Sequence, residues 1–338
     1  MKALNKLISF LLFLPLSGCM PMSYPPGEKS QTAQLTDNVY LTEDGASLPL
    51  RSWLPAAEPS AVLIALHGFN DYSNFFDQPG QYFSTLGIAC FAYDQRGFGG
   101  APKRGLWAGG SAYADDLQVF VRLIKQRYPK RPVYLLGESM GGAIIITAMK
   151  NPDMPMVEGI ILAAPALWAR RTMPWYQTGL LWTLAHFMPW LTLTGKGVHV
   201  TPSDNIEMLR ALGKDPLVIK ATRVETVYGL TNLMDAAFSS AKSLSGNTLM
   251  LYGEKDEIIP KKPTYAFLQQ FLASDITEKT VAFYEHGYHM LLRDLQASTA
   301  LKDIAAWINL NPEKQLPSGA DKRARAVLSQ FSSITFRK

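Results

Sequence analysis

The sequence predicts an α/β fold, in which a mostly parallel central sheet is flanked by helices and carries an inserted helical cap. Short apolar segments that end at glycine or acidic loops alternate with segments of helical periodicity, as parallel strands and crossover helices do. One long stretch, residues 166–244, interrupts this alternation without a clear strand. The 338 residues are 47% hydrophobic and 18% charged, which suits one large globular domain with an insertion.

The expected elements follow one another along the chain. Apolar residues alternate on both sides of the Asp44–Gly45 turn, so the fold should open with antiparallel strands. A helix is expected around Leu117–Ile124, and a further helical region at 291–308, where apolar residues recur at helical spacing. The remaining strands are expected at AVLIALHG, IACFAYD, VYLLGE and GIILAAPA before the interruption, and at TLMLYGEKD and VAFYEHG after it.

The N-terminal segment MKALNKLISFLLFLPLSGC has the pattern of an export signal. Lys2 and Lys6 precede the apolar run 7–16, which is shorter than the roughly 20 apolar residues that a membrane span needs. The ending Leu-Ser-Gly-Cys resembles the lipobox of bacterial lipoproteins, in which cleavage precedes a Cys that is then acylated. We therefore expect a signal peptide at 1–18 and lipidation of Cys19; an ordinary signal peptide with an incidental Cys is the alternative.

Cysteine usage agrees with a lipid anchor. Cys19 and Cys90 are the only cysteines, so no disulfide framework is expected, and Cys90 should be an inert buried thiol. Several acyl chains would make the anchor durable. Met20 stands where an Asp would favour inner-membrane retention, which predicts an exported protein anchored to an outer membrane. Residues 19–38 are polar and contain prolines, as expected of a tether between anchor and domain.

A Gly-x-Ser-x-Gly pattern, formed by Gly137, Ser139 and Gly141, lies between a strand-like run and an apolar, helix-compatible stretch. A serine hydroxyl is a weak nucleophile that needs a base, an acid group to orient the base, and N–H donors for the oxyanion. In such sites the acid and the base follow the serine in chain order, each after a later strand. Asp256 and His289 occupy those places. Nearby alternatives are Glu254, Glu257 and His286.

Several motifs together resemble α/β-hydrolases of the monoacylglycerol lipase and lysophospholipase type, which are grouped with serine aminopeptidases. They are HGFNDYS, YDQRGFGG, GESMGG, YGEKDEIIP and GYHMLLRD, within residues 39–310. The resemblance implies that Ser139 is the nucleophile, Asp256 the acid and His289 the base. It also implies an oxyanion hole made by the backbone N–H groups of Phe69 and Met140. Lipases of this family often have a small residue in place of Phe69, so a narrower or differently shaped acyl pocket is expected.

Other polar residues in these motifs are expected to be structural. The resemblance places His67 beneath the oxyanion loop, and Asp94 and Arg96 should hold a loop rather than take part in chemistry. His186 and His199 lie in the insertion without a metal-ligand pattern near them. No metal and no cofactor are therefore expected.

The interruption at 166–244 lies where the family inserts a cap between two parts of the core, 39–165 and 245–310. It is rich in tryptophan and other large apolar residues, among them Trp168, Trp175, Trp182 and Trp190. This favours a lid that is apolar on one face and suits a fatty acyl chain or a membrane interface. The alternative is that these side chains pack the cap onto the core.

The predicted function is hydrolysis of carboxylic esters of lipids, such as monoacylglycerols or lysophospholipids, through an acyl-enzyme. Alternatives are a thioesterase, an aminopeptidase in which Glu207 or Glu225 holds the substrate amine, and a catalytically silent binding protein at the cell surface. The expected partners are a lipid ester and, through Cys19, a membrane. The net charge of +5 is modest, and the sequence has no stripe of Lys and Arg interleaved with aromatic residues. No nucleic-acid partner is therefore expected.

The last segment, residues 311–338, extends past the usual end of the family. It contains Lys322, Arg323 and Arg325. A basic, solvated tail is the expectation for such a charge run, with contact to anionic lipid as the alternative.

Overall fold

The structure, a computed structural model, describes residues 21–195, 197, 199–244, 246–273, 278–309 and 315–335, with only the backbone described for 331–335. The predicted signal peptide at 1–18 and the predicted lipidation site Cys19 lie outside the described residues. No helix in the described part of the chain is long and apolar enough to cross a bilayer.

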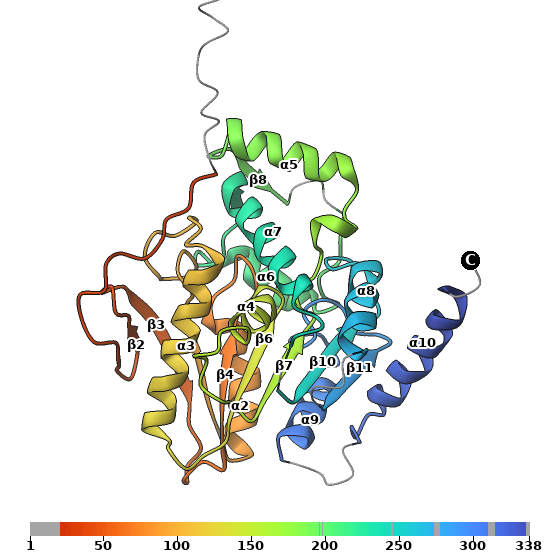
Figure 1. The fold of residues 1–338 in the computed structure, drawn as a ribbon. Helices are drawn as coiled ribbons and strands as arrows, with labels where there is room; N and C mark the ends of the chain where they lie inside the picture. Colours follow the sequence, from red (N-terminus) through yellow and green to blue (C-terminus); the bar gives the residue numbers. More distant parts are fainter. Residues whose placement is uncertain are drawn as a thin grey trace, which may run out of the picture.

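A nine-stranded sheet forms the centre of the molecule, in the order β1-β2-β3-β5-β4-β6-β7-β10-β11 (Figure 1). The pairs from β5 through β11 are parallel, and β1, β2 and β3 pair antiparallel at one side. This arrangement confirms the predicted fold class and the opening hairpin. The strands are β1 (Gln34–Leu35), β2 (Val39–Leu41), β3 (Ser47–Trp53), β4 (Ala61–Leu66), β5 (Ile88–Tyr93), β6 (Val133–Glu138), β7 (Gly159–Ala163), β10 (Thr248–Gly253) and β11 (Lys279–Tyr284).

Helices cover both faces of the sheet. On one face, α3 (Gly110–Arg127), α4 (Met140–Ala148) and α8 (Lys261–Leu272) share a hydrophobic core with Val62, Ile64 and Leu66 of β4. On the other face, α2 (Asp77–Thr85) and α9 (Ala297–Ile308) share a core with Leu63 and Ala65 of the same strand. Because both faces are buried, the strand is apolar throughout and not alternating. The predicted helical region at 291–308 is helical only from Ala297.

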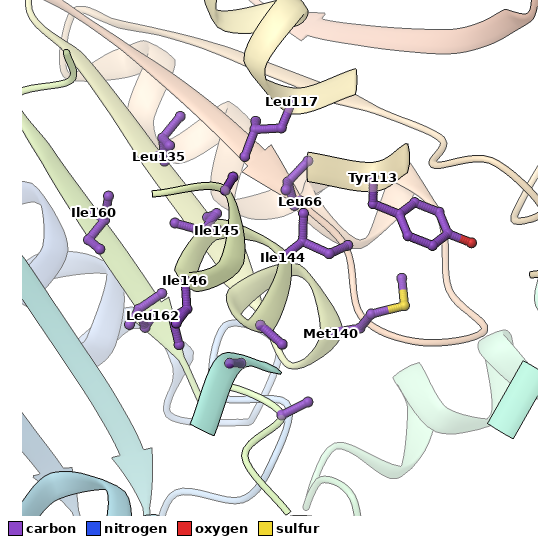
Figure 2. Close-up of a cluster of buried hydrophobic side chains, with 14 of the residues drawn as sticks. Leu66, Tyr113, Leu117, Leu135, Met140, Ile144, Ile145, Ile146, Ile160 and Leu162 are labelled. Carbon is purple, nitrogen blue, oxygen red and sulfur yellow. The ribbon is translucent and has the colours of Figure 1, made fainter. Parts of the chain in front are cut away.

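Helix α4 is surrounded by apolar side chains (Figure 2). Residues of β4, β6 and β7, among them Leu66, Leu135 and Ile160, lie around it, and Leu117 of α3 closes the cluster. Every residue of α4 except Thr147 is buried. The residue that precedes this helix is therefore held by a rigid element.

The insertion lies between β7 and β10, and its helices rise above one end of the sheet (Figure 1). It contains a short antiparallel pair, β8 with β9, although no strand was expected there. Each of these strands has only three residues, too few to show a periodic pattern. The elements are η2 (Arg170–Thr172), α5 (Trp175–Phe187), β8 (Thr192–Thr194), α6 (Ile206–Lys214), β9 (Ala221–Arg223) and α7 (Val224–Ser239).

The described part of the expected tether lies against the domain. Tyr24 N donates a hydrogen bond to Trp107 O at 2.7 Å, and Gly27 N donates one to Asp44 Oδ2 at 2.9 Å. Strand β1 also falls within the range expected to be tether and pairs with β2. The ordered domain thus begins earlier than residue 39.

The C-terminal segment forms helix α10 (Ala320–Thr335), which packs beside β11 (Figure 1). This differs from the expected solvated tail. Ala324 is buried and Val327 is partly buried against the core, while Arg323 forms ion pairs with Glu254 and Glu285. Small and apolar residues recur at helical spacing here, and this periodicity, rather than the basic charges, decides where the segment lies.

Candidate active site

Ser139 lies in a sharp turn between β6 and α4. Its backbone has φ 52° and ψ −111°, a conformation that residues other than glycine rarely adopt and that is costly to hold. The turn is also tight, because a Cβ on Gly137 would clash with the backbone of Gly141, and one on Gly141 would clash with Leu66 O. Only glycine fits at both positions. The chain therefore stores strain at Ser139 and holds it with a buried helix.

Asp256 and His289 are joined although they lie far apart in sequence. Asp256 follows β10, His289 follows β11, and their parallel strands are neighbours in the sheet. His289 Nδ1 lies 2.8 Å from Asp256 Oδ2, and both side chains are buried. Asp256 Oδ1 accepts hydrogen bonds from the N–H groups of Ile258 and Ile259 at 2.8 and 2.9 Å. One carboxylate oxygen is thus fixed by backbone while the other faces the imidazole.

This pair determines the electrostatics of the imidazole. With Nδ1–H donated to Asp256, Nε2 carries the free lone pair that a base needs. Burial disfavours the charged ring, but the charge and hydrogen bond of Asp256, together with the nearby Glu138 carboxylate, outweigh burial, and the pKa of His289 lies above its ordinary value. The hydrogen bonds of the described residues join Asp256 to His289 and do not extend to the Ser139 hydroxyl. Catalytic hydrogen bonds of this kind are often long until substrate is bound.

The alternative candidates for the acid and the base either contact other residues or are exposed. Glu254 forms an ion pair with Arg323 of α10, and Glu257 Oε2 accepts a hydrogen bond from Thr201 N at 2.6 Å. His286 is exposed. Of the candidates, Asp256 alone contacts His289 by a hydrogen bond in the described residues.

The loop after β4 passes beside Ser139. A Cβ placed on Gly68 would lie 3.4 Å from Ser139 Cβ, so the neighbouring Phe69 is close to the turn. Phe69 N–H takes part in no backbone hydrogen bond among the described loops. Met140 is the first residue of α4, and its N–H therefore has no intrahelical acceptor and lies at the positive end of the helix. Both N–H groups are available to a developing negative charge.

The cap is tied to this same loop. Asn70, at φ 65°, donates from Nδ2 to Thr222 Oγ1 of β9 at 2.7 Å, and its carbonyl accepts from Ile219 N at 3.0 Å. Tyr72 OH donates to Asp215 Oδ2 at 2.7 Å. Sequence reasoning missed these residues, because nothing in either segment indicates that the two meet. The position of the loop thus depends on the cap.

A buried ionic group lies under the site and was also missed. Arg293 contacts Asp71 Oδ2 at 2.8 Å and Glu138 Oε1 at 2.7 Å. Burial disfavours the charged guanidinium, but Glu138 and Asp71 outweigh it and raise the pKa of Arg293. Burial also raises the pKa of Glu138, against the opposing effect of Arg293. The available signal was that each residue lies within a motif that had been singled out for other residues.

The residues expected to be structural have structural contacts. His67 Nε2 accepts from Gln95 N at 3.0 Å, and Nδ1 lies 2.8 Å from Gly68 O. Burial lowers the pKa of His67, so the ring is neutral and both nitrogens are occupied. Asp94 accepts hydrogen bonds from Ser73 N and Gly100 N. Arg96 lies between Asp44 and Asp116.

No group of three or more His, Cys, Asp or Glu side chains suited to a metal ion occurs among the described residues. Cys90 is buried, and burial raises the pKa of its thiol.

The apolar residues of the cap divide between the core and the surface. Trp168 packs against the core. Helix α5 has Ala185 as its only buried residue, and it exposes large apolar side chains over most of its length. The exposed side chains of α5 and the loop after it include Trp175 at 84%, Leu180 at 60%, Trp182 at 51% and Trp190 at 57%.

Comparison with known proteins decides the family. The family described as serine aminopeptidase, S33, matches residues 57–296, which is more than half of the chain. The chain belongs to this hydrolase family. The match includes the Ser139 turn, Asp256 and His289, and most of it lies in the α/β core and its cap.

Relatives of the chain within the α/β-hydrolases share nearly their whole length with it. A monoglyceride lipase from Rattus norvegicus is 29% identical over 86% of this chain and 96% of its own. A monoacylglycerol lipase from Mycolicibacterium smegmatis is 24% identical over 76% and 90%, respectively.

Solved structures share the fold. A monoglyceride lipase from Saccharomyces cerevisiae in complex with a substrate analog matches with a TM-score of 0.67 and 19% identity, over 85% of this chain and 98% of that one. The Paleococcus ferrophilus monoacylglycerol lipase has a TM-score of 0.63 and 20% identity, over 77% and 98%, respectively.

Proposed function

We propose that this hydrolase cleaves carboxylic esters of lipids through an acyl-enzyme on Ser139, with monoacylglycerols or lysophospholipids as the substrate class. The observation that carries the proposal is the buried Asp256–His289 hydrogen bond at the same edge of the parallel sheet as the strained serine turn. Similarity to monoglyceride lipases at up to 29% identity supports lipid esters as the substrate.

The proposed reaction uses groups whose positions are described above. His289 Nε2 takes the proton of Ser139 Oγ as that oxygen attacks the ester carbonyl, and Asp256 stabilises the resulting imidazolium. The N–H groups of Phe69 and Met140 hold the tetrahedral oxyanion. The imidazolium then protonates the leaving alcohol, and a water molecule, deprotonated in turn by His289, releases the fatty acid from Ser139.

Hydrolysis of a substrate panel by the purified chain tests this proposal. The panel pairs monoacylglycerols, lysophospholipids, short esters and aminoacyl amides, and Ser139→Ala is the control. We expect ester hydrolysis that the substitution abolishes, and covalent labelling of Ser139 by a fluorophosphonate probe. Full esterase activity in Ser139→Ala would exclude the proposed nucleophile.

The cap supports a lipid substrate in particular. Contiguous apolar side chains on a protein surface mark sites of contact with lipid, ligand or protein, and helix α5 exposes several. We propose that this face receives the fatty acyl chain or the membrane interface. Lipidation of Cys19 after export, with anchoring to an outer membrane, is part of the same proposal. Radiolabelled palmitate should enter the wild-type chain and not Cys19→Ala.

Of the three alternatives, the aminopeptidase has less support from the contacts. An aminopeptidase would use Glu207 or Glu225 to hold an amine, but Glu225 is buried and pairs with Arg223 at 2.5 Å, and Glu207 lies on α6 at the surface. A thioesterase would use the same residues as an esterase, and the substrate panel extended by an acyl thioester separates the two. A catalytically silent surface protein would fail to react with the fluorophosphonate probe.

A further inference from the structure

Arg293 lies at the centre of a buried group that joins three segments of the proposed catalytic apparatus: the histidine loop, the oxyanion loop and the end of β6 before Ser139. It is in the loop that carries His289, four positions further on, and its backbone N–H donates to Met290 O at 2.8 Å. Its guanidinium contacts Asp71, in the loop that carries Phe69, at 2.8 Å. It also contacts Glu138, the residue directly before Ser139, at 2.7 Å. One side chain thus joins segments that are far apart in sequence.

Stability alone is a poor explanation for this group. The side chains of Arg293, Asp71 and Glu138 are 8%, 7% and 3% exposed, so three charged groups are taken out of water. Replacing such a group by well-packed apolar residues is often neutral or stabilising. Its hydrogen bonding is also incomplete, because Arg293 Nε and Glu138 Oε2 have no hydrogen-bond partner among the described residues. What the group does supply is a fixed separation between the histidine loop, the loop after β4 and the end of β6.

The geometry suits arginine and no other cation. The planar guanidinium offers several N–H donors in a rigid fork, and here Nη1 contacts the loop after β4 while Nη2 contacts the end of β6. The ring of Phe75 lies beside it, 5.8 Å from ring centroid to Cζ, and limits its movement. Lysine would retain the charge but could not direct two donors from a planar group.

We propose that Arg293 is a positioning residue that fixes the oxyanion loop, the serine turn and the histidine loop relative to one another through its contacts with Asp71 and Glu138. The proposal rests on the function proposed above, because its effect is exerted through Phe69, Ser139 and His289. It assigns Arg293 no contact with the substrate.

Charge gives a readout that a purely structural role would not affect. The charged groups that act on His289 are Asp256 after β10, Glu138 at the end of β6, and Arg293 in its own loop; the two carboxylates raise its pKa and Arg293 lowers it. Activity requires the neutral imidazole, so kcat/KM rises with pH through this pKa. The acid limb is the part of the kcat/KM profile that rises with pH through this pKa. Removing the charge of Glu138 should therefore move the acid limb to lower pH, and removing the charge of Arg293 should move it to higher pH.

The experiment compares matched variants of the full chain with a soluble short-chain ester. Glu138→Gln removes a charge but keeps an oxygen that can accept a hydrogen bond from Arg293, so we expect a smaller loss of kcat than in Arg293→Gln and a pKa on the acid side of the kcat/KM profile (the acid limb) that is lower by about one pH unit. Arg293→Gln should shift the limb up by about one unit and lower kcat at least about tenfold, with KM nearly unchanged. Arg293→Lys should leave the limb in place and still lower kcat, because charge is kept and the fork is lost.

Arg96→Gln is the matched control. Arg96 is likewise buried and joins two carboxylates, those of Asp44 and Asp116, outside the proposed apparatus. We expect it to lower the melting temperature while leaving kcat per folded molecule and the acid limb unchanged. If Arg293→Gln fails to fold, Glu138→Gln carries the test, since it retains the shape of the site.

The outcomes separate this inference from the function on which it rests. Unmoved acid limbs in Arg293→Gln and Glu138→Gln, or an Arg293→Gln profile that matches Arg96→Gln, would overturn the positioning role while Ser139 remains essential. If Arg293→Gln does not fold, an acid limb of Glu138→Gln at the same pH as that of the wild type would overturn the positioning role. An active Ser139→Ala would instead overturn the proposed function itself.

Discussion

Substitution of Thr222 by Val tests whether the cap holds the oxyanion loop. The change is nearly isosteric and removes the Oγ1 that accepts a hydrogen bond from Asn70 Nδ2 at 2.7 Å. Thr222 is 8% exposed and Asn70 is partly buried, so the donor would lose its protein acceptor in a region only partly open to water. Asn70 Oδ1 already has no hydrogen-bond partner among the described residues, and the substitution would therefore leave the whole amide unsatisfied.

The magnitude follows from the bonds that are lost and kept. A lost hydrogen bond costs about 1 kcal/mol, and up to about 3 kcal/mol where a buried donor remains unpaired. If the loss falls on the transition state, this corresponds to about a 5-fold to 150-fold lower kcat. The bonds from Ile219 N to Asn70 O and from Tyr72 to Asp215 remain. We therefore expect a decrease near the lower end, about 5-fold to 10-fold.

The assay is steady-state hydrolysis of a soluble short-chain ester, with kcat and KM determined separately. Thr231→Val is the control, because Thr231 is also a buried threonine of the cap, but its hydroxyl donates within its own helix, to Val227 O at 2.9 Å. Equal kcat values for Thr222→Val and Thr231→Val would refute the coupling of cap and loop. A loss confined to KM would point to substrate contact and not to the oxyanion loop.

Three further predictions concern the histidine and the serine turn. Because Asp256 raises the pKa of His289, the wild-type kcat/KM should fall with acid through a pKa above about 6.5. Asp256→Asn should lower kcat by about 10⁴-fold and move that limb to lower pH, and a pH-rate profile with an unmoved limb would contradict the assignment. Gly141→Ala should lower the free energy of unfolding by about 1–3 kcal/mol, because its Cβ meets Leu66 O. Urea denaturation checks this against Gly213→Ala, where nothing lies within 4 Å and a gain of about 0.5–1 kcal/mol is expected.

Local pattern was enough to predict much of the fold. The buried strands are short apolar runs that end at glycine or acidic loops, and each was predicted from its own sequence. The Gly137, Ser139 and Gly141 spacing reflects a steric requirement of one turn, so it is visible within five residues. The proximity of Asp256 and His289 could be predicted because each follows a strand of the parallel sheet, and the carboxyl ends of parallel strands share one edge of a sheet.

Contacts between distant segments were not predictable in this way. The C-terminal helix shows the limit, since a basic segment expected in solvent packs beside β11 and pairs Arg323 with Glu254. The tie between Asn70 and Thr222 spans 152 positions and has no local signature.

The sequence by itself therefore determined the α/β class, the glycine-flanked serine turn and the order of Ser139, Asp256 and His289 after their strands, because these depend on periodicity and steric rules within short segments. Only the tertiary structure decided which charged residues support the site. Arg293 joins Asp71 and Glu138 across the molecule. A charge can be buried only where its partners meet in space, and no short segment records that meeting.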